Sequence, residues 1–181
     1  DSKISPTDRP KARSMVATAM SELNGGTRSC NLANSTAIRH NTHMAELVFD
    51  QKERIGAWVA EQTGQDSSWG SFYAFGVIKG DEVIAGVVIN NYNGSNATCH
   101  IAVAQQTKLL ISLFHHVCDY AFNHCKLKRL TGMVPMNEPA VIEFDKHLGF
   151  EEEFVMKDGA VDSDMQVLVM WPDKCRWLHK E

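Results

Sequence analysis

The sequence of 181 residues contains no long apolar run. No stretch approaches the ~20 apolar residues that a helix needs to cross a membrane. The N-terminus also lacks the hydrophobic core of a secretory signal peptide. We therefore expect a cytoplasmic protein without a membrane partner. The chain begins with aspartate rather than methionine, which suggests that its true start has been trimmed.

An excess of basic charge is absent as well. The formal net charge is -4 at pH 7 and the sequence pI is near 6.1. A broad basic surface for nucleic acid or anionic lipid would need the opposite balance, although a local patch remains compatible with it. A nucleic-acid partner is therefore not expected.

The cysteines lack the pattern of a disulfide framework or a zinc site. There are five, with no close pair, at Cys30, Cys99, Cys118, Cys125 and Cys175. An odd, scattered set is typical of free thiols in a reducing compartment. His40 and His43 are close in sequence, but that spacing has no special geometry in a loop or strand, so we expect no metal.

The composition is that of an ordinary globular protein, with 44% hydrophobic and 22% charged residues. Residues 1–26 predict a polar arm followed by a short helix, because Met15, Val16, Ala19, Met20 and Leu23 recur at helical spacing before Gly25 and Gly26. Residues 27–181 are long enough for a single domain with a sizeable core.

The rest of the chain predicts alternating strands and helices. Residues 45–59 favour an amphipathic helix, and residues 107–124 and 135–147 favour two more. Strands are predicted at 36–39, 72–77, 83–89, 98–104, 129–134, 153–156 and 165–170, with turns at 79–82 and 158–159. Hairpins together with one strand, helix, strand unit indicate an α/β or α+β fold, in which helices flank a mixed, mostly antiparallel central sheet.

The element order from Phe72 to Met170 resembles the GCN5-related N-acetyltransferase (GNAT) superfamily. In that family an Asn opens the last helix, which ends in a Leu-Gly-Phe turn; here these are Asn137 and Leu148-Gly149-Phe150. Glycine suits this turn because it can adopt the left-handed conformation that caps a helix. Three phrases, Asn90 to Gly94, Lys128 to Gly132 and Cys175 to Trp177, further resemble acetyltransferase-like proteins of bacteriophages and prophages, which would place the protein in the host cytoplasm.

The resemblance implies acetyl-coenzyme A (acetyl-CoA) as cofactor, bound where the strand at 100–104 separates from the strand at 129–134. The backbone of Ala102, Val103 and Ala104 would bind the pantetheine arm, which Asn137 or Glu138 would also contact.

The pyrophosphate would lie at Gln105, Gln106, Thr107 and Lys108. The family's glycines are missing there, so only Gln105 fits. The helix N-terminus, the Thr107 hydroxyl and the Lys108 charge could still bind phosphate. Alternatively, this stretch is a polar lead-in with Thr107 as the helix cap.

Two residues are catalytic candidates. Many family members donate a proton to the leaving thiolate from a tyrosine, and Asp145 or Phe144 occupies that position here. Asp145 can donate only if burial raises its pKa. Alternatively, Phe144 packs in the core and Asp145 is a solvated helix residue. His100 is the candidate general base, because imidazole titrates near neutrality, although a lone strand histidine is more often a packed or surface residue.

The substrate side would be lined by aromatic and amide side chains: Trp69, Tyr73, Asn90, Asn91 and Tyr92. Packing is the alternative role for the two tyrosines, and a turn using left-handed Asn and Gly explains the Asn-rich loop equally well.

The sequence thus predicts an N-acetyltransferase acting on an unidentified amine, with a homodimer as one assembly. Its alternatives are a catalytically inactive GNAT-like virion-associated or interaction protein, and a base-modifying enzyme of the same fold, which the acidic balance disfavours.

Overall fold

The computed structural model describes residues 44–178. The predicted arm and helix of residues 1–26 and the predicted strand at 36–39 lie outside the described residues, as do Cys30, His40 and His43. Within the described part of the chain, no helix is long and apolar enough to span a membrane.

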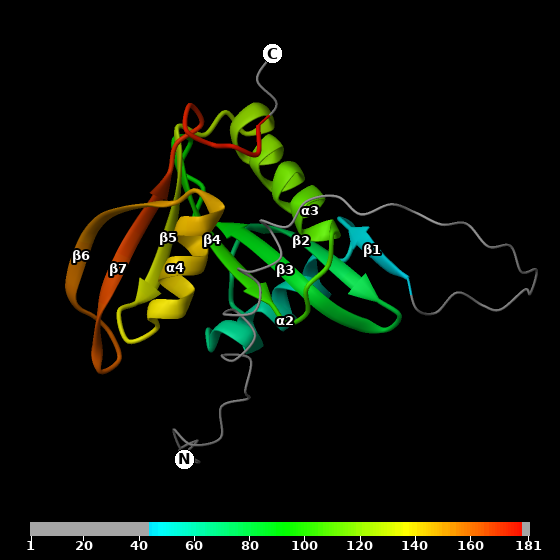
Figure 1. The fold of residues 1–181 in the computed structure, drawn as a ribbon, viewed down its shortest axis with the longest axis horizontal. Helices are drawn as coiled ribbons and strands as arrows, with labels where there is room; N and C mark the ends of the chain where they lie inside the picture. Colours follow the sequence, from blue (N-terminus) through cyan, green and yellow to red (C-terminus); the bar gives the residue numbers. More distant parts are fainter. Residues whose placement is uncertain (1–43, 179–181) are drawn as a thin grey trace, which may run out of the picture.

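A seven-stranded sheet forms the centre of the protein, in the order β1-β2-β3-β4-β5-β7-β6 (Figure 1). The strands are β1 (Ala45–Val48), β2 (Phe72–Lys79), β3 (Glu82–Asn90), β4 (Asn96–Val103), β5 (Arg129–Pro135), β6 (Glu151–Ala160) and β7 (Ser163–Met170). Every neighbouring pair is antiparallel except β4 and β5, which are parallel. The predicted mixed, mostly antiparallel sheet is therefore confirmed.

Helices cover both faces of this sheet. Helix α2 (Lys52–Thr63) buries Ile55 and Val59 against Val88 and Ala102. On the opposite face lie α3 (Leu109–Cys118), its π-helical continuation η2 (Asp119–His124) and α4 (Pro139–Leu148), whose apolar residues belong to the larger of the two cores. We call these two sides the α2 face and the α4 face.

The helix predicted for residues 45–59 is wrong in its first part. Residues 45–48 form β1, which pairs with β2 from Ala45 opposite Lys79 to Val48 opposite Gly76, and α2 begins only at Lys52. A short apolar run cannot be assigned to helix or strand from its periodicity. The free edge of β2 offers backbone hydrogen bonds that decide for the strand.

Other boundaries differ as well. The turn predicted at 158–159 is absent, because β6 continues to Ala160 and the chain reverses at Val161 and Asp162, where Asp162 has φ 59°. Helix α4 starts at Pro139 rather than at 135, as proline favours the first helical turn. Helix α3 starts at Leu109 rather than 107.

Strands β4 and β5 separate soon after they begin. Their parallel ladder contains three pairs, Asn96 with Arg129, Ala97 with Leu130 and Thr98 with Thr131. On its other side β4 stays paired with β3 as far as Val103. Among the described residues, the edge of β4 from Cys99 to Val103 that faces β5 therefore has no strand partner.

Candidate functional site

The separation of β4 and β5 creates the candidate site. It begins between Thr98 and Cys99 on β4 and between Thr131 and Gly132 on β5. Backbone N-H and C=O groups on an open strand edge require partners, and an extended ligand with amide groups could supply them. Ala102 and Val103, predicted to bind cofactor, lie on this open edge.

On the α2 face, His100 belongs to a hydrogen-bonded group of side chains. Its Nε2 lies 3.1 Å from Oδ1 of Asn90, whose Nδ2 donates to the carbonyl of Trp69 at 3.4 Å. The rings of His100 and Trp69 are 4.7 Å apart between centroids. Burial lowers the pKa of His100 from 6.5 to about 4, because it disfavours the imidazolium form. His100 is therefore neutral near pH 7.

On the α4 face, Asp145 is buried, with 7% of its surface exposed. Burial raises the pKa of this carboxyl from 3.8 to about 7. A Cβ atom placed on Gly132 would lie 3.8 Å from its Oδ2, so the carboxyl borders the start of the separation. The alternative that Asp145 is solvated is thus wrong, whereas core packing of Phe144 is confirmed. A carboxyl with this pKa still carries a transferable proton at neutral pH.

The connection between β4 and α3 has a distinctive set of hydrogen bonds. The amides of Ala104 and Gln105 both donate to the carbonyl of Ile84, at 2.8 and 3.2 Å. Those of Gln106, Thr107 and Lys108 donate to no other residue within 44–178. They lie at the N-terminus of α3, where free amides and the helix dipole favour an anion.

Thr107 also acts at this helix start. Its hydroxyl accepts a hydrogen bond from the amide of Leu109 at 3.3 Å, and its carbonyl accepts one from Leu110 at 3.1 Å. Thr107 thus accepts hydrogen bonds at the helix start, although Lys108 is the residue that directly precedes α3. Capping uses oxygen atoms of Thr107 and leaves its amide available, so the two predicted roles are compatible.

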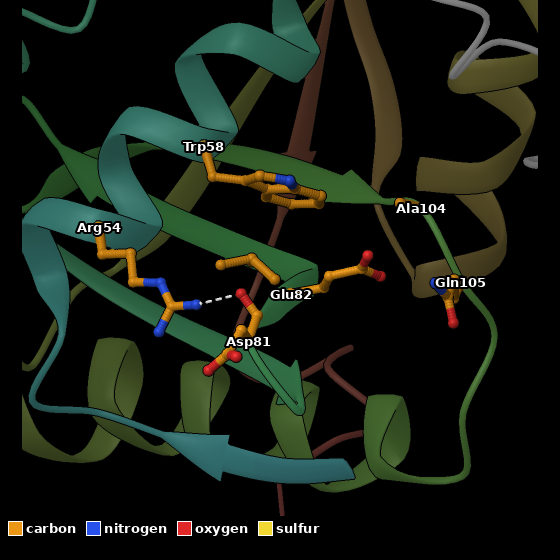
Figure 2. Close-up of a pocket in the computed structure, with 7 residues that line it drawn as sticks. Arg54, Trp58, Asp81, Glu82, Ala104 and Gln105 are labelled. Carbon is orange, nitrogen blue, oxygen red and sulfur yellow. Dashed lines mark hydrogen bonds between the residues drawn. The ribbon is translucent and has the colours of Figure 1, made fainter. Parts of the chain in front are cut away.

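A pocket of about 400 Å³ adjoins the end of β4 (Figure 2). Its lining residues come from α2, the β2–β3 hairpin and the end of β4: Arg54, Trp58, Asp81, Glu82, Val83, Ala104 and Gln105. Arg54 donates to the carbonyl of Asp81 at 2.5 Å, which fixes the hairpin against α2. Only Ala104 and Gln105 were predicted as site residues. The i, i+4 spacing of Arg54 and Trp58, which places both on one helix face, is a signal that could have indicated these two residues.

The predicted substrate residues divide between the two faces. Trp69 and Asn90 surround His100, and Asn91 donates to the hydroxyl of Thr98 at 3.4 Å. Tyr92 is exposed in the following loop. Tyr73 instead lies on the α4 face, where its ring centroid is 4.8 Å from that of Tyr120. The structure does not bring Tyr73 together with His100, because successive residues of β2 point to opposite faces.

Asn137 and Glu138 lie at the connection between β5 and α4. The amide of Asn137 donates to the Ser163 hydroxyl at 3.2 Å, and Glu138 directly precedes the helix. Since β4 and β5 are parallel, both strands end at the same edge of the sheet. Asn137 and Glu138 therefore lie on the side of the separation where Gln105 to Lys108 lie. Across residues 44–178, no cluster of histidine, cysteine and acidic side chains could hold a metal ion.

No protein-family model and no curated protein matches the sequence. Solved structures do. The spermidine N-acetyltransferase of Vibrio cholerae in complex with CoA and spermine superposes with a TM-score of 0.56 at 13% identity, over 72% of this chain and 96% of that one. A dodecameric structure of the same enzyme in an intermediate state gives 0.57 at 15% identity, over 72% and 95%.

The chain has a GNAT-like fold. At these identities the similarity establishes the fold alone, and chemistry has to be argued from the residues. The separated strands β4 and β5, together with the helix that starts directly after β4, are the parts of this fold on which the candidate site is built.

Proposed function

We propose that the protein is an acetyl-CoA-dependent N-acetyltransferase that transfers the acetyl group directly to an amine. The observation that carries this proposal is the separation of β4 from β5 after three residue pairs, with the buried carboxyl of Asp145 beside it. An open strand edge, an anion site at a helix start and a proton donor are what such a transfer requires.

Acetyl-CoA would bind along the open edge of β4. The backbone of Ala102 and Val103 would pair with its pantetheine amides. The phosphates would lie at the amides of Gln106, Thr107 and Lys108, because those of Ala104 and Gln105 already bind the Ile84 carbonyl. Free backbone amides bind phosphate without glycine when the loop leaves them accessible, so the missing glycines are compatible with cofactor binding.

Bound acetyl-CoA would supply the thioester whose acetyl group is transferred. Asp145 would hold a proton on its carboxyl and give it to the sulfur as the carbon–sulfur bond breaks. His100, which is neutral near pH 7, would accept a hydrogen bond from the attacking amine and orient it. Its low pKa makes it a weak base, so the amine would reach it already deprotonated. As the carbon–nitrogen bond forms, the nitrogen would lose one proton to water, and the proton given up by Asp145 would be replaced from water.

Calorimetry with acetyl-CoA tests the cofactor step. We expect binding by the wild type and weaker binding by Lys108→Ala, which removes the charge beside the free amides. Lys157→Ala on β6, another exposed lysine, is the matched control and should bind like the wild type. No binding heat and no thermal shift at millimolar acetyl-CoA would refute the proposal.

Mass spectrometry of acetylated products then tests the transfer. Spermidine and spermine are the first acceptors to use, because the structural neighbours are named for spermidine and one holds spermine. Asp145→Asn should bind acetyl-CoA but lose most of the turnover. Full activity in this variant would remove Asp145 from the mechanism.

A second candidate function is an interaction protein without catalysis. It is favoured by the edge strand β6, where Phe154, Val155 and Met156 are 51%, 45% and 41% exposed. An edge strand with exposed apolar side chains can pair with another chain, including a second copy in a homodimer. Light scattering over a range of concentrations, with Val155→Lys as the disrupting variant, tests this. Self-association without acetyl-CoA binding would favour this second function.

The phage or prophage type and the host cytoplasm remain predictions from the short sequence phrases alone. The base-modifying alternative would need a basic groove, which the formal net charge of -4 disfavours. Mass analysis of nucleosides from co-expressed DNA tests it directly, and unmodified nucleosides would exclude it.

A further inference from the structure

Asn90 and His100 are diagonal neighbours on two antiparallel strands. Asn90 pairs with Thr98, and His100 pairs with Val88, so both side chains point to the α2 face. Asn90 is only 7% exposed, which is unusual for a side chain with four hydrogen-bonding sites. A buried amide of this kind is expected to have a definite set of partners.

The partners of Asn90 determine how its amide is oriented. The carbonyl of Trp69 can only accept, so the amide nitrogen Nδ2 must face it, at 3.4 Å. The amide oxygen Oδ1 then faces Nε2 of His100, at 3.1 Å. Because this oxygen can also only accept, the neutral imidazole must carry its hydrogen on Nε2. Nδ1 is left with the free lone pair.

The Trp69 carbonyl is itself held in place. The indole Nε1 of Trp69 donates to the carbonyl of Gly56 at 3.0 Å, and its ring packs on His100. A Cβ atom on Gly56 would approach Phe72 Cε2 to 2.8 Å and Trp69 Cδ1 to 3.3 Å, so glycine allows this close packing. A continuous series of contacts therefore runs from α2 through Trp69 and Asn90 to the imidazole.

We propose that Asn90 is a positioning residue that holds His100 as the Nε2–H tautomer and leaves Nδ1 as the acceptor for the substrate amine. The part concerning the amine rests on the proposed acetyltransferase function. The tautomer does not, since it follows from contacts within the protein. Asn90 therefore acts through His100. The sequence had suggested a different role for Asn90, which was direct contact with the substrate.

Nitrogen-15 NMR of the histidine rings at pH 8 tests the tautomer without any activity. We expect the Nε2–H form for His100. His116 is an internal control with the opposite expectation, because its Nδ1 lies 2.7 Å from the carbonyl of Ser112, which can only accept. A wild-type His100 in the Nδ1–H form would overturn the proposal.

Two substitutions test the role of Asn90. Asn90→Leu removes the acceptor and should give a mixture of both tautomers. Asn90→Asp keeps an oxygen facing Nε2 and should retain the Nε2–H form while raising the pKa of His100, since a carboxylate favours imidazolium. An unchanged His100 spectrum in Asn90→Leu would refute the assignment. If Asn90→Leu does not fold, Asn90→Ser is the smaller variant, judged by the same spectrum.

Steady-state kinetics separates the tautomer from its use in catalysis. Removal of a group that orients a functional histidine typically costs ~10- to 100-fold. We expect kcat of Asn90→Leu to fall by about that factor while acetyl-CoA binding is unchanged. Asn90→Asp should keep much of the wild-type kcat, and the acidic limb of its pH profile should move to higher pH. If Asn90→Leu loses the tautomer but keeps the kcat of the wild type, the role for Nδ1 is refuted. If the wild type shows the expected tautomer but no activity, only the enzyme proposal is refuted.

Discussion

Beside the separated strands, the titratable side chains on the two faces of the sheet have different surroundings. On the α2 face, His100 contacts Asn90 and Trp69, which orient its ring. On the α4 face, Asp145 forms no hydrogen bond through its carboxyl to another described residue, and burial is the cause of its raised pKa. Burial alone selects the neutral form of a group, whereas directed hydrogen bonds also select its orientation.

This difference predicts opposite effects on stability as the pH changes. The folded pKa of Asp145 is raised, so its cost to stability appears as the pH rises from 3.8 to about 7. The folded pKa of His100 is lowered, so its cost appears as the pH falls from 6.5 to about 4. Between about pH 4 and about pH 7, a rise in pH therefore increases the cost from Asp145 and decreases the cost from His100 in the wild type.

The largest effect is expected for Asp145→Asn. The difference between the two pKa values of Asp145 corresponds to a cost of roughly 4 kcal/mol above pH 7, using 1.36 kcal/mol for each pKa unit. The variant should lack this dependence, so its free energy of unfolding relative to the wild type should rise between pH 4 and pH 8 in urea denaturation. Asp158→Asn, on exposed β6, is the control. If Asp145→Asn keeps the wild-type pH dependence, the carboxyl is not buried as described.

A somewhat smaller effect of the opposite sign is expected for His100→Gln. The lowered pKa of His100 costs up to roughly 3 kcal/mol at pH 4. The variant should avoid that cost, so its stability relative to the wild type should increase as the pH falls from 6.5 to 4. The same urea series measures it, with exposed His116→Gln as control. Parallel pH profiles of His100→Gln and Asp145→Asn would contradict the contrast between the faces.

The smallest effects are expected at two glycines, one on each face. In Gly56→Ala the new methyl group would press on Phe72 and Trp69, which should cost about 1–2 kcal/mol after the gain in helix propensity. In Gly132→Ala the nearest atoms would be 3.7 Å away, which is ordinary contact, so stability should change by less than ~1 kcal/mol. Thermal unfolding compares the pair, and equal losses would show that the α2 face is no more tightly packed.

Much of the fold could be predicted from the sequence, because periodicity and turn residues act locally. The strands of the β2–β3 hairpin, the long helix after β4 and the left-handed cap at Gly149, with φ 109°, were all predicted. Residues 45–48 were not, since their apolar run suits helix and strand equally. Their conformation depends on the edge of β2, about thirty residues later in the chain.

The sequence named candidate site residues but not their surroundings. The family resemblance pointed to Asp145 or Phe144, yet the burial of Asp145 depends on the α4 face of β5. Sequence spacing did not indicate that Trp69 packs on His100, that Tyr73 faces away from it, or that Arg54 and Trp58 line a pocket with Gln105. Each of these relations joins elements that are distant in the chain.

The sequence by itself determined the order of strands and helices from Phe72 onward, because hydrophobic spacing, proline and glycine act over a few residues. Only the tertiary structure decided how far β4 and β5 stay paired, which face each polar side chain occupies and which side chain lies beside His100. These properties depend on burial and on directed hydrogen bonds between separate strands and helices, and such contacts exist only after the chain has folded.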